Sequence, residues 1–154
     1  MCGIVGYTGP KQCVKSLLDG LGKLEYRGYD SAGIAVLDGG GIAIRKSEGK
    51  LARLLELVGR EPVAGTCGVG HTRWATHGRP SDVNAHPHQA GVVAVVHNGI
   101  IENHQTLKTR LKGKGRRFDS DTDTEVISHL LDEYTCEGLS LAEATRRAAA
   151  DLRG

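Results

Sequence analysis

The sequence predicts a single α+β domain, in which short strands and amphipathic helices share one core. Its length of 154 residues fits one domain. Two apolar runs, residues 32–37 and 41–45, are separated by Asp38-Gly39-Gly40, a pattern typical of a β-hairpin. Elsewhere, apolar residues recur every three or four positions, which is the spacing of a buried helix face. A hairpin together with such helices in one short chain favours the α+β class.

Each further element follows from a local pattern. Residues 3–8 form a short apolar run closed by Gly9-Pro10, which predicts a first strand. Residues 68–74 and 92–97 predict later strands on either side of a long polar loop, residues 75–91, and loops of that length are usually functional. Two early helices are predicted from the apolar faces Val14, Leu17, Leu18, Leu21 and Leu24, then Leu51, Leu54, Leu55 and Val58.

Two capping boxes predict two later helices. Thr122 with Glu125, and Ser140 with Glu143, have the spacing at which side chains satisfy the first backbone N–H groups of a helix. The first of these helices is predicted to bury Val126, Ile127, Leu130, Leu131 and Tyr134.

Composition and charge exclude several function classes. The chain has 20 Lys and Arg against 18 Asp and Glu, and a net charge of +2 is too balanced for a nucleic-acid-binding or anionic-membrane protein. No apolar run approaches the roughly 18 residues that cross a bilayer. We therefore expect a cytoplasmic protein with neither nucleic acid nor membrane as a partner. The basic residues 108–117 predict a solvated helix face and loop, with phosphate binding as a minor alternative.

The cysteines and histidines do not predict a metal site. The four cysteines, at positions 2, 13, 67 and 136, include no CxxC pair, so free thiols are expected. Among the seven histidines, His86 and His88 are two positions apart, and His71 and His77 are near in sequence. No carboxylate or thiolate completes a recognisable ligand set, so neither a metal nor another cofactor is expected.

Cys2 is the candidate nucleophile. Methionine aminopeptidases remove Met1 when the next residue is small, so Cys2 is expected to carry its thiol beside a free α-amino group. That amine has a reference pKa of about 7.7 to 8 and can accept the thiol proton. Gly3 removes side-chain bulk beside the thiol. Taken alone, a cysteine at this position is more often an accident near a chain end.

Five segments give the cysteine a context. They are LEYRGYDSAG (24–33), GHTRWATHG (70–78), NAHPH (84–88), HNGIIEN (97–103) and SDTDTE (120–125). In order and spacing they resemble the N-terminal glutaminase domain of the glutamine:fructose-6-phosphate aminotransferases. These are class II glutamine amidotransferases of the N-terminal nucleophile superfamily. The resemblance extends from Met1 to at least Leu131, and residues 26–33 and 84–88 favour this sugar-aminating branch over the amidophosphoribosyltransferases.

The resemblance implies a four-layer α/β/β/α sandwich of two mainly antiparallel sheets. The family's glutaminase domain is longer than this chain, so residues 1–154 are expected to form it in part, with the second sheet incomplete at the C-terminus. Two sugar-isomerase domains follow in the family and are expected to be absent here. Fructose 6-phosphate would bind only through those domains, and a homodimer is expected of the complete enzyme.

The resemblance also implies the catalytic residues. Cys2 would attack the carboxamide of L-glutamine, while the Asn98 side-chain amide and the Gly99 backbone N–H form the oxyanion hole. An Asn-Gly pair alone most often marks a hairpin turn. The position of this pair, after His97 and before residues 100–103, favours the catalytic interpretation.

The substrate contacts come from the same resemblance. The planar guanidinium of Arg73 suits a carboxylate, and Arg73, Thr76 and His77 would hold the α-carboxylate of glutamine. Asp123 would bind the α-ammonium, although its place near a predicted helix start also allows a capping or dipole role.

Two further contacts are implied. The Arg27-Gly28 turn would line the glutamine pocket, and Trp74 would border the path by which ammonia leaves.

The function implied is hydrolysis of glutamine to glutamate and ammonia. In the complete enzyme the ammonia would serve the conversion of fructose 6-phosphate to glucosamine 6-phosphate. The alternative is a catalytically silent fragment, or a regulatory module that binds glutamine without turning it over.

Overall fold

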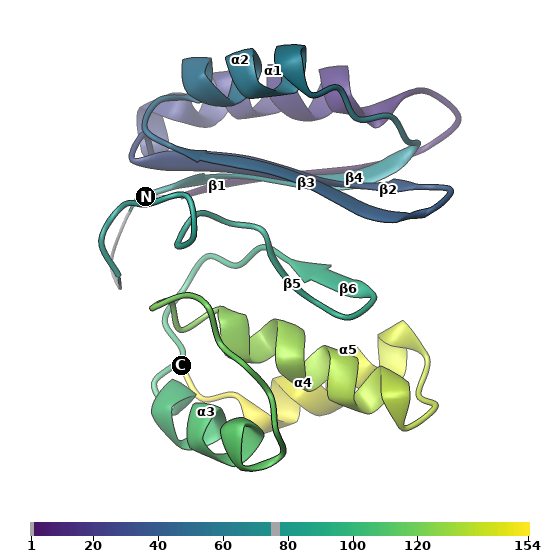
Figure 1. Cartoon of the computed structure of the whole chain (residues 1–154), viewed down its shortest axis with the longest axis vertical. Coiled ribbons are helices and arrows are strands. Elements are labelled where there is room, and N and C mark those ends of the chain that lie inside the picture. Colours follow the sequence, from purple (N-terminus) through teal and green to yellow (C-terminus); the bar gives the residue numbers. More distant parts are fainter. Residues whose placement is uncertain (1, 75–77) are drawn as a thin grey trace.

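The computed structural model describes residues 2–74 and 78–154, without the side chain of Arg27. These residues stack in four layers, with helices outside and two antiparallel sheets inside (Figure 1). The predicted α+β class and the α/β/β/α order are therefore confirmed. No helix in the described ranges is long and apolar enough to span a membrane.

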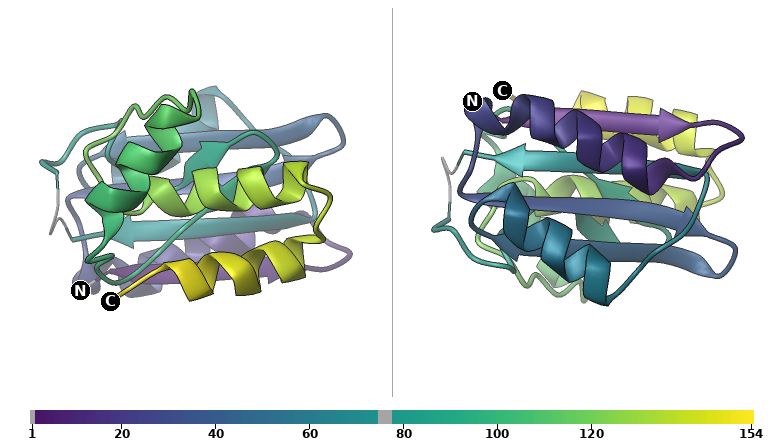
Figure 2. Two further views of the ribbon diagram at one scale, coloured as in Figure 1. Left: turned by 90° about the horizontal axis from the view of Figure 1, so that it is seen from below. Right: turned by 90° about the horizontal axis from the view of Figure 1, so that it is seen from above.

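The first sheet contains, within the described residues, β1 (Gly3–Thr8), β4 (Cys67–Arg73), β2 (Ser31–Asp38) and β3 (Gly41–Glu48), in that spatial order. All its neighbouring strands are antiparallel, and β2 and β3 form the predicted hairpin. Helices α1 (Cys13–Leu24) and α2 (Leu51–Arg60) cover its outer face (Figure 2). The predictions of the first strand and of both early helices are confirmed.

The core beneath α1 and α2 is apolar. Leu17 and Leu21 of α1 and Leu54 of α2 are fully buried and pack against β2 of the first sheet. Gly20 brings α1 close to β1, because an added Cβ would lie 2.9 Å from both methyl groups of Val5. Gly20 destabilises the helix by roughly 1 kcal/mol relative to Ala, but it allows this close contact between helix and sheet.

The second sheet consists, in the described part of the chain, of β5 (His88–Ala90) and β6 (Val93–Val95). It packs on α4 (Glu125–Cys136), beside which lies α5 (Leu141–Asp151). The predicted strand over residues 92–97 is shorter than expected, and β5 lies inside the predicted loop over residues 75–91. Because Pro87 has no N–H to donate, the ladder ends at the pair His88–Val95.

One of the two predicted capping boxes is wrong. Helix α4 begins at Glu125 after Thr124, and no side chain caps it. The Glu125 carboxylate instead accepts hydrogen bonds from the backbone N–H groups of Asp119 (2.9 Å) and Ser120 (2.8 Å), so it holds the preceding loop. The second box, Ser140 with Glu143 at the start of α5, is confirmed.

The basic run is more than a solvated face. It begins in α3 (His104–Gly113), which agrees with the helix face predicted there, and continues into the loop after that helix. Its cations meet acidic residues of α4, which are themselves largely buried. The pairs are Arg110–Glu133, Lys114–Glu133 and Arg116–Asp132.

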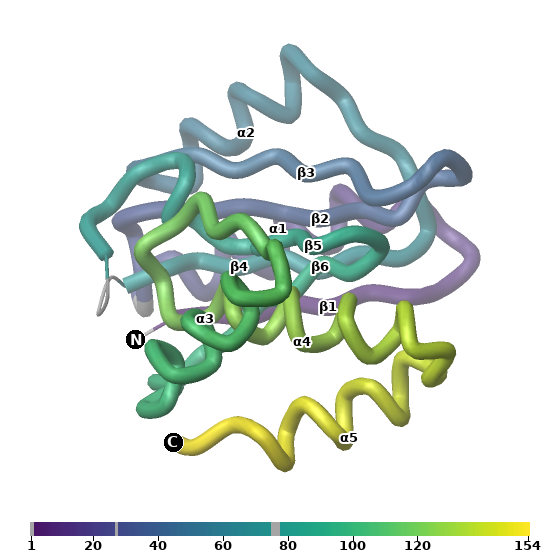
Figure 3. Tube along the Cα trace, turned by 60° about the horizontal axis from the view of Figure 1, so that its bottom comes forward, coloured from purple at the N-terminus to yellow at the C-terminus, as the bar shows by residue number. Residues whose placement is uncertain are grey.

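The last residues of the chain lie beside the start of α3 (Figure 3). Glu102 N donates to Arg153 O at 2.7 Å, and the Asn103 side chain donates to Asp151 O at 2.8 Å. These bonds tie α5 to the segment that follows β6.

Candidate active site

The Cys2 thiol lies against the end of β4. The antiparallel register of β1 and β4 pairs Gly3 with Thr72, which brings the residue before Gly3 next to the residues that follow Thr72. The Cys2 Sγ accepts a hydrogen bond from Trp74 N at 3.2 Å and lies 3.6 Å from Trp74 O. Backbone groups of Trp74 therefore hold the half-buried thiol in place, so Cys2 is not part of a frayed chain end.

Gly3 fits this position for a packing reason. An added Cβ would lie 2.7 Å from Leu24 Cβ and 2.9 Å from Thr72 Oγ1. Only a residue without a side chain lets the start of β1 pass between α1 and β4 at this distance. Gly3 was predicted to remove side-chain bulk beside the thiol. These contacts show that it also lets the strand that carries Cys2 pack against α1 and β4.

The Arg27-Gly28 turn also reaches the end of β4. A Cβ on Gly28 would lie 2.8 Å from both the carbonyl carbon and the oxygen of Arg73, and 3.1 Å from Trp74 N. The turn follows the short helix η1 (Glu25–Arg27), so its backbone and that of Arg73 are in direct contact. The Arg27 side chain lies outside the described part of the structure.

Arg73 and Trp74 take different positions at the end of β4. Arg73 is buried, and its Nη2 donates to Gly78 O at 3.0 Å. Trp74 is 47% exposed and packs edge-to-face on Tyr29, with ring centroids 5.4 Å apart. The other two candidates for binding the carboxylate, Thr76 and His77, lie outside the described residues.

Asn98, in the segment that follows β6 of the second sheet, contacts Cys2. Its Nδ2 donates to Cys2 O at 3.2 Å, which joins two residues 96 positions apart. The Asn-Gly pair follows β6, whereas the turn of the β5–β6 hairpin lies at residues 91–92, so the hairpin-turn interpretation is wrong. Gly99 has a φ of +150°, and an added Cβ would lie 2.9 Å from His97 Nε2, so this backbone favours glycine.

Asp123 lies beside the same segment. It is buried, and its Oδ2 accepts a hydrogen bond from Ile101 N at 2.7 Å. Among the described residues no side chain caps α4, so the capping alternative for Asp123 is wrong, while the dipole alternative stays a prediction. Its negative charge raises the pKa of His97, although burial has the larger effect and keeps that pKa below its usual value.

Three buried histidine rings lie behind Asn98. His71, on β4, has its Nε2 2.8 Å from Asn98 Oδ1, and its ring stacks on that of His86 at 4.3 Å. The His86 ring in turn contacts that of His88 at 4.7 Å. Burial lowers the pKa of His71 to about 4 and that of His88 to about 3, so both are neutral at pH 7.

From the sequence, His71 was a candidate only for a metal site, which was not expected. Among the described residues no group of histidine, cysteine and carboxylate side chains could hold a metal ion. The signal that could have singled out His71 is its place in a strand: a polar side chain at a fully buried position, next to Gly70, needs a polar partner.

The arrangement brings together most of the sequence-predicted set. Cys2, the Arg27-Gly28 backbone, Arg73 and Trp74 lie at one end of the first sheet, and Asn98 links them to Gly99 in the segment after β6. A thiol beside a side-chain amide and a glycine N–H can attack a carbonyl and bind the resulting oxyanion.

Comparison with known proteins shows which family the chain is similar to. A family model described as "Glutamine amidotransferase domain" matches residues 61–144. Curated proteins named glutamine–fructose-6-phosphate aminotransferase (isomerizing) match the whole chain at 56% identity in Caldanaerobacter subterraneus subsp. tengcongensis and in Thermus thermophilus. The matched regions are 25% and 26% of those proteins, so the chain spans about a quarter of their length.

A solved structure shares the fold. Glutamine phosphoribosylpyrophosphate amidotransferase from B. subtilis, in complex with ADP and GMP, superposes with a TM-score of 0.82 at 26% identity. The match covers all of this chain and 33% of that one. The fold predicted for N-terminal nucleophile amidotransferases is thereby confirmed, and the chain belongs to the glutamine amidotransferase domain family.

Proposed function

We propose that this domain hydrolyses L-glutamine to glutamate and ammonia, with Cys2 as the nucleophile after removal of Met1. The observation that carries the proposal is the hydrogen bond from the Asn98 side-chain amide to Cys2 O. It joins the side-chain amide of the segment after β6 to the backbone of the residue that carries the thiol, so that a donor and a nucleophile for acyl transfer belong to neighbouring residues.

The reaction uses groups of the chain itself. The α-amine of Cys2 takes the thiol proton, and Sγ bonds to the carboxamide carbon of glutamine while the carbonyl π electrons move to oxygen. Asn98 Nδ2 and Gly99 N–H bind that oxyanion. As it collapses, the C–N bond breaks and the α-ammonium gives its proton to the departing ammonia. Water then attacks the γ-glutamyl thioester, losing a proton to the α-amine. The C–S bond breaks, glutamate leaves, and the α-ammonium returns the proton to sulfur, which regenerates the thiol.

The substrate is held by its charged end. Arg73, Thr76 and His77 are proposed to bind the α-carboxylate of glutamine, and Asp123 its α-ammonium. The backbone of Arg27 and Gly28 lines the pocket, which the contact between Gly28 and Arg73 supports. Trp74, half-exposed beside the thiol, borders the exit path of ammonia.

The acceptor of the ammonia is proposed from the relatives. Because the chain spans about a quarter of the length of proteins named glutamine–fructose-6-phosphate aminotransferase, residues 1–154 correspond to part of a glutaminase domain. Conversion of fructose 6-phosphate to glucosamine 6-phosphate is assigned to sugar-isomerase domains outside these residues, in a homodimeric enzyme.

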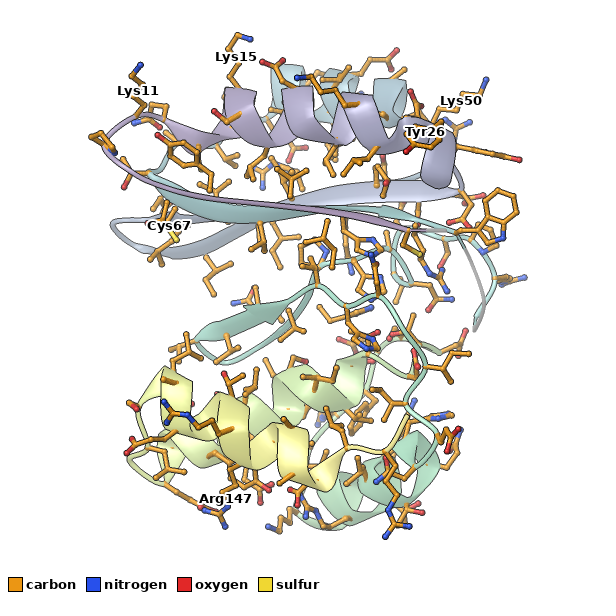
Figure 4. The ribbon with its side chains drawn as sticks, turned by 180° about the vertical axis from the view of Figure 1, so that it is seen from behind. Lys11, Lys15, Tyr26, Lys50, Cys67 and Arg147 are labelled. Carbon is orange, nitrogen blue, oxygen red and sulfur yellow. The ribbon has the colours of Figure 1, made fainter. Side chains whose placement is uncertain are left out.

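One experiment separates hydrolysis from a silent, glutamine-binding role. Intact mass should show the loss of Met1, and a glutaminase assay should show turnover that Cys2→Ala abolishes. Cys67→Ser is the matched control, because Cys67 begins β4 and lies at the opposite end of the first sheet from Tyr26 and its neighbouring turn (Figure 4). Turnover that survives Cys2→Ala would refute the assignment, and glutamine binding without turnover would favour the regulatory module.

A further inference from the structure

His71 is placed to hold the Asn98 side chain from behind. It lies in the middle layers of the fold, where the β4 register pairs it with Ile4 of β1 on one side and Gly33 of β2 on the other. Its side chain is fully buried, and its Nε2 is 2.8 Å from Asn98 Oδ1.

The partners of Asn98 fix which atom faces which way. Cys2 O can only accept a hydrogen bond, so the Asn98 group near it is the Nδ2 amine. Asn98 Oδ1 then faces His71 and can only accept, so the hydrogen lies on His71 Nε2. One Nδ2 hydrogen is used on Cys2 O, which leaves the second for a reacting oxyanion.

The surroundings of His71 keep its ring in this orientation. The His86 ring stacks on it with an interplanar angle of 31°. Gly33, opposite His71 in the sheet, makes that stacking possible, because an added Cβ would lie 2.2 Å from His86 O. The His71 ring is therefore enclosed by its neighbours. Among the described side chains, its hydrogen-bond partner is Asn98.

We propose that His71 is a positioning residue, which holds the Asn98 amide so that its second N–H points at the oxyanion of the tetrahedral intermediate. This inference rests on the proposed function, because it assigns Asn98 to the oxyanion hole. Burial lowers the pKa of His71 to about 4, so the donor at neutral pH is the neutral ring. A displaced donor costs rate and leaves ground-state binding of glutamine intact.

The test is a double-mutant cycle in the full chain with Met1 removed. His71→Leu should lower kcat for glutamine hydrolysis by about 10- to 100-fold with KM nearly unchanged. In the Asn98→Ala background the same substitution should cost no further activity, because the two residues act as one unit. His71→Gln, which can place an N–H near the position of Nε2, should restore most of kcat.

His88→Gln is the matched control. His88 is as buried as His71 and belongs to the same ring stack, but its Nε2 pairs with Thr122 Oγ1. It should leave kcat close to that of the unmodified chain. If His71→Leu shows no cooperative unfolding, His71→Asn replaces it, since its shorter amide cannot reach Asn98 Oδ1, and the comparison with His71→Gln is unchanged.

The outcomes separate this inference from the proposed function. If Asn98→Ala keeps full kcat, the proposed oxyanion hole is wrong. If Asn98→Ala lowers kcat but His71→Leu does not, or if His71→Leu costs the same factor with and without Asn98, only the positioning role is overturned. A rise in KM at unchanged kcat would overturn it as well.

Discussion

The two sheets supply the two halves of the candidate site, and they are held by different forces. In the first sheet, continuous antiparallel ladders and an apolar layer under α1 and α2 fix the backbone that carries Cys2, Arg73 and Trp74. The second sheet has a ladder of three residue pairs, and Val92 beside it is 78% exposed. The segment that follows it, with Asn98 and Gly99, is joined to the rest of the site by side-chain hydrogen bonds, and Ile101 anchors it in the apolar core around α4.

Because of this difference, the two halves of the site should respond differently to side-chain substitutions. Backbone ladders tolerate most side-chain substitutions, so the nucleophile half should keep its geometry through many of them. The oxyanion half is held through His71, Asn98 and Asp123, and each of these bonds joins a side chain to a distant segment. Single substitutions there should therefore change catalysis more than stability.

The largest effect is expected at Asn98. Asn98→Ala should lower kcat by roughly 10²- to 10³-fold with little change in KM, because the oxyanion forms only on the way to the transition state. Asn103→Ala is the matched control: its amide donates to Asp151 O, outside the proposed pocket. Steady-state kinetics with glutamine measure both. An unchanged kcat in Asn98→Ala would mean that the second half of the site contributes no oxyanion donor.

A smaller effect is expected at Asp123. Asp123→Asn keeps an oxygen that can accept from Ile101 N and removes the negative charge that would bind the substrate ammonium. KM for glutamine should rise by roughly 10- to 100-fold, corresponding to about 1.5 to 3 kcal/mol for a charged hydrogen bond, while kcat changes little. Thermal unfolding should stay close to that of the unmodified chain. A large loss of stability with an unchanged KM would show that Asp123 is only structural.

A further prediction concerns acid stability and involves both sheets, because His71 lies on β4 and His88 on β5. His71 and His88 have folded-state pKa values of about 4 and about 3 because burial disfavours their charged form. The unfolded chain binds their protons first, so stability is complete above pH 6.5 and is lost as the pH falls toward about 4 for His71 and about 3 for His88. The expected slope is roughly 1.4 kcal/mol per pH unit for each histidine.

Glu125 extends this loss to lower pH. Burial alone would raise its pKa, but contact with His129 and hydrogen bonds from residues 119 and 120 outweigh it and lower the pKa to about 2. Its stabilisation is present above about pH 4.5 and lost toward 2. Denaturant unfolding at pH 7, 5.5 and 4.5 checks the histidine window, and His88→Gln should reduce the slope there. A slope that His88→Gln leaves unchanged would contradict this assignment.

Sequence patterns predicted the first sheet better than the second for a physical reason. The faces of α1, α2, β1 and the β2–β3 hairpin are apolar, and apolar periodicity is what a sequence displays directly. Strand β5 consists of His, Gln and Ala, so it has no apolar run of its own, although it pairs with the apolar strand β6. Glu125 fits the capping-box spacing, yet its carboxylate binds the loop before α4, a choice that only the packing of that loop determines.

The site followed the same division. The family resemblance identified the residues, and the structure places Gly28 against Arg73 and Asn98 against Cys2 through strand register and turns. The role inferred for His71 could not be predicted, because it depends on a hydrogen bond across 27 residues and on the stacking of His86.

The central claim is that Cys2 is the thiol on which both halves converge. An electrophilic glutamine analogue such as a diazo-ketone should form one covalent adduct, and peptide mapping by mass spectrometry should place it on Cys2. Excess glutamine should slow the labelling, because the analogue and the substrate compete for one pocket. Adduct mainly on exposed Cys67 or Cys136, or labelling that glutamine does not slow, would contradict the account.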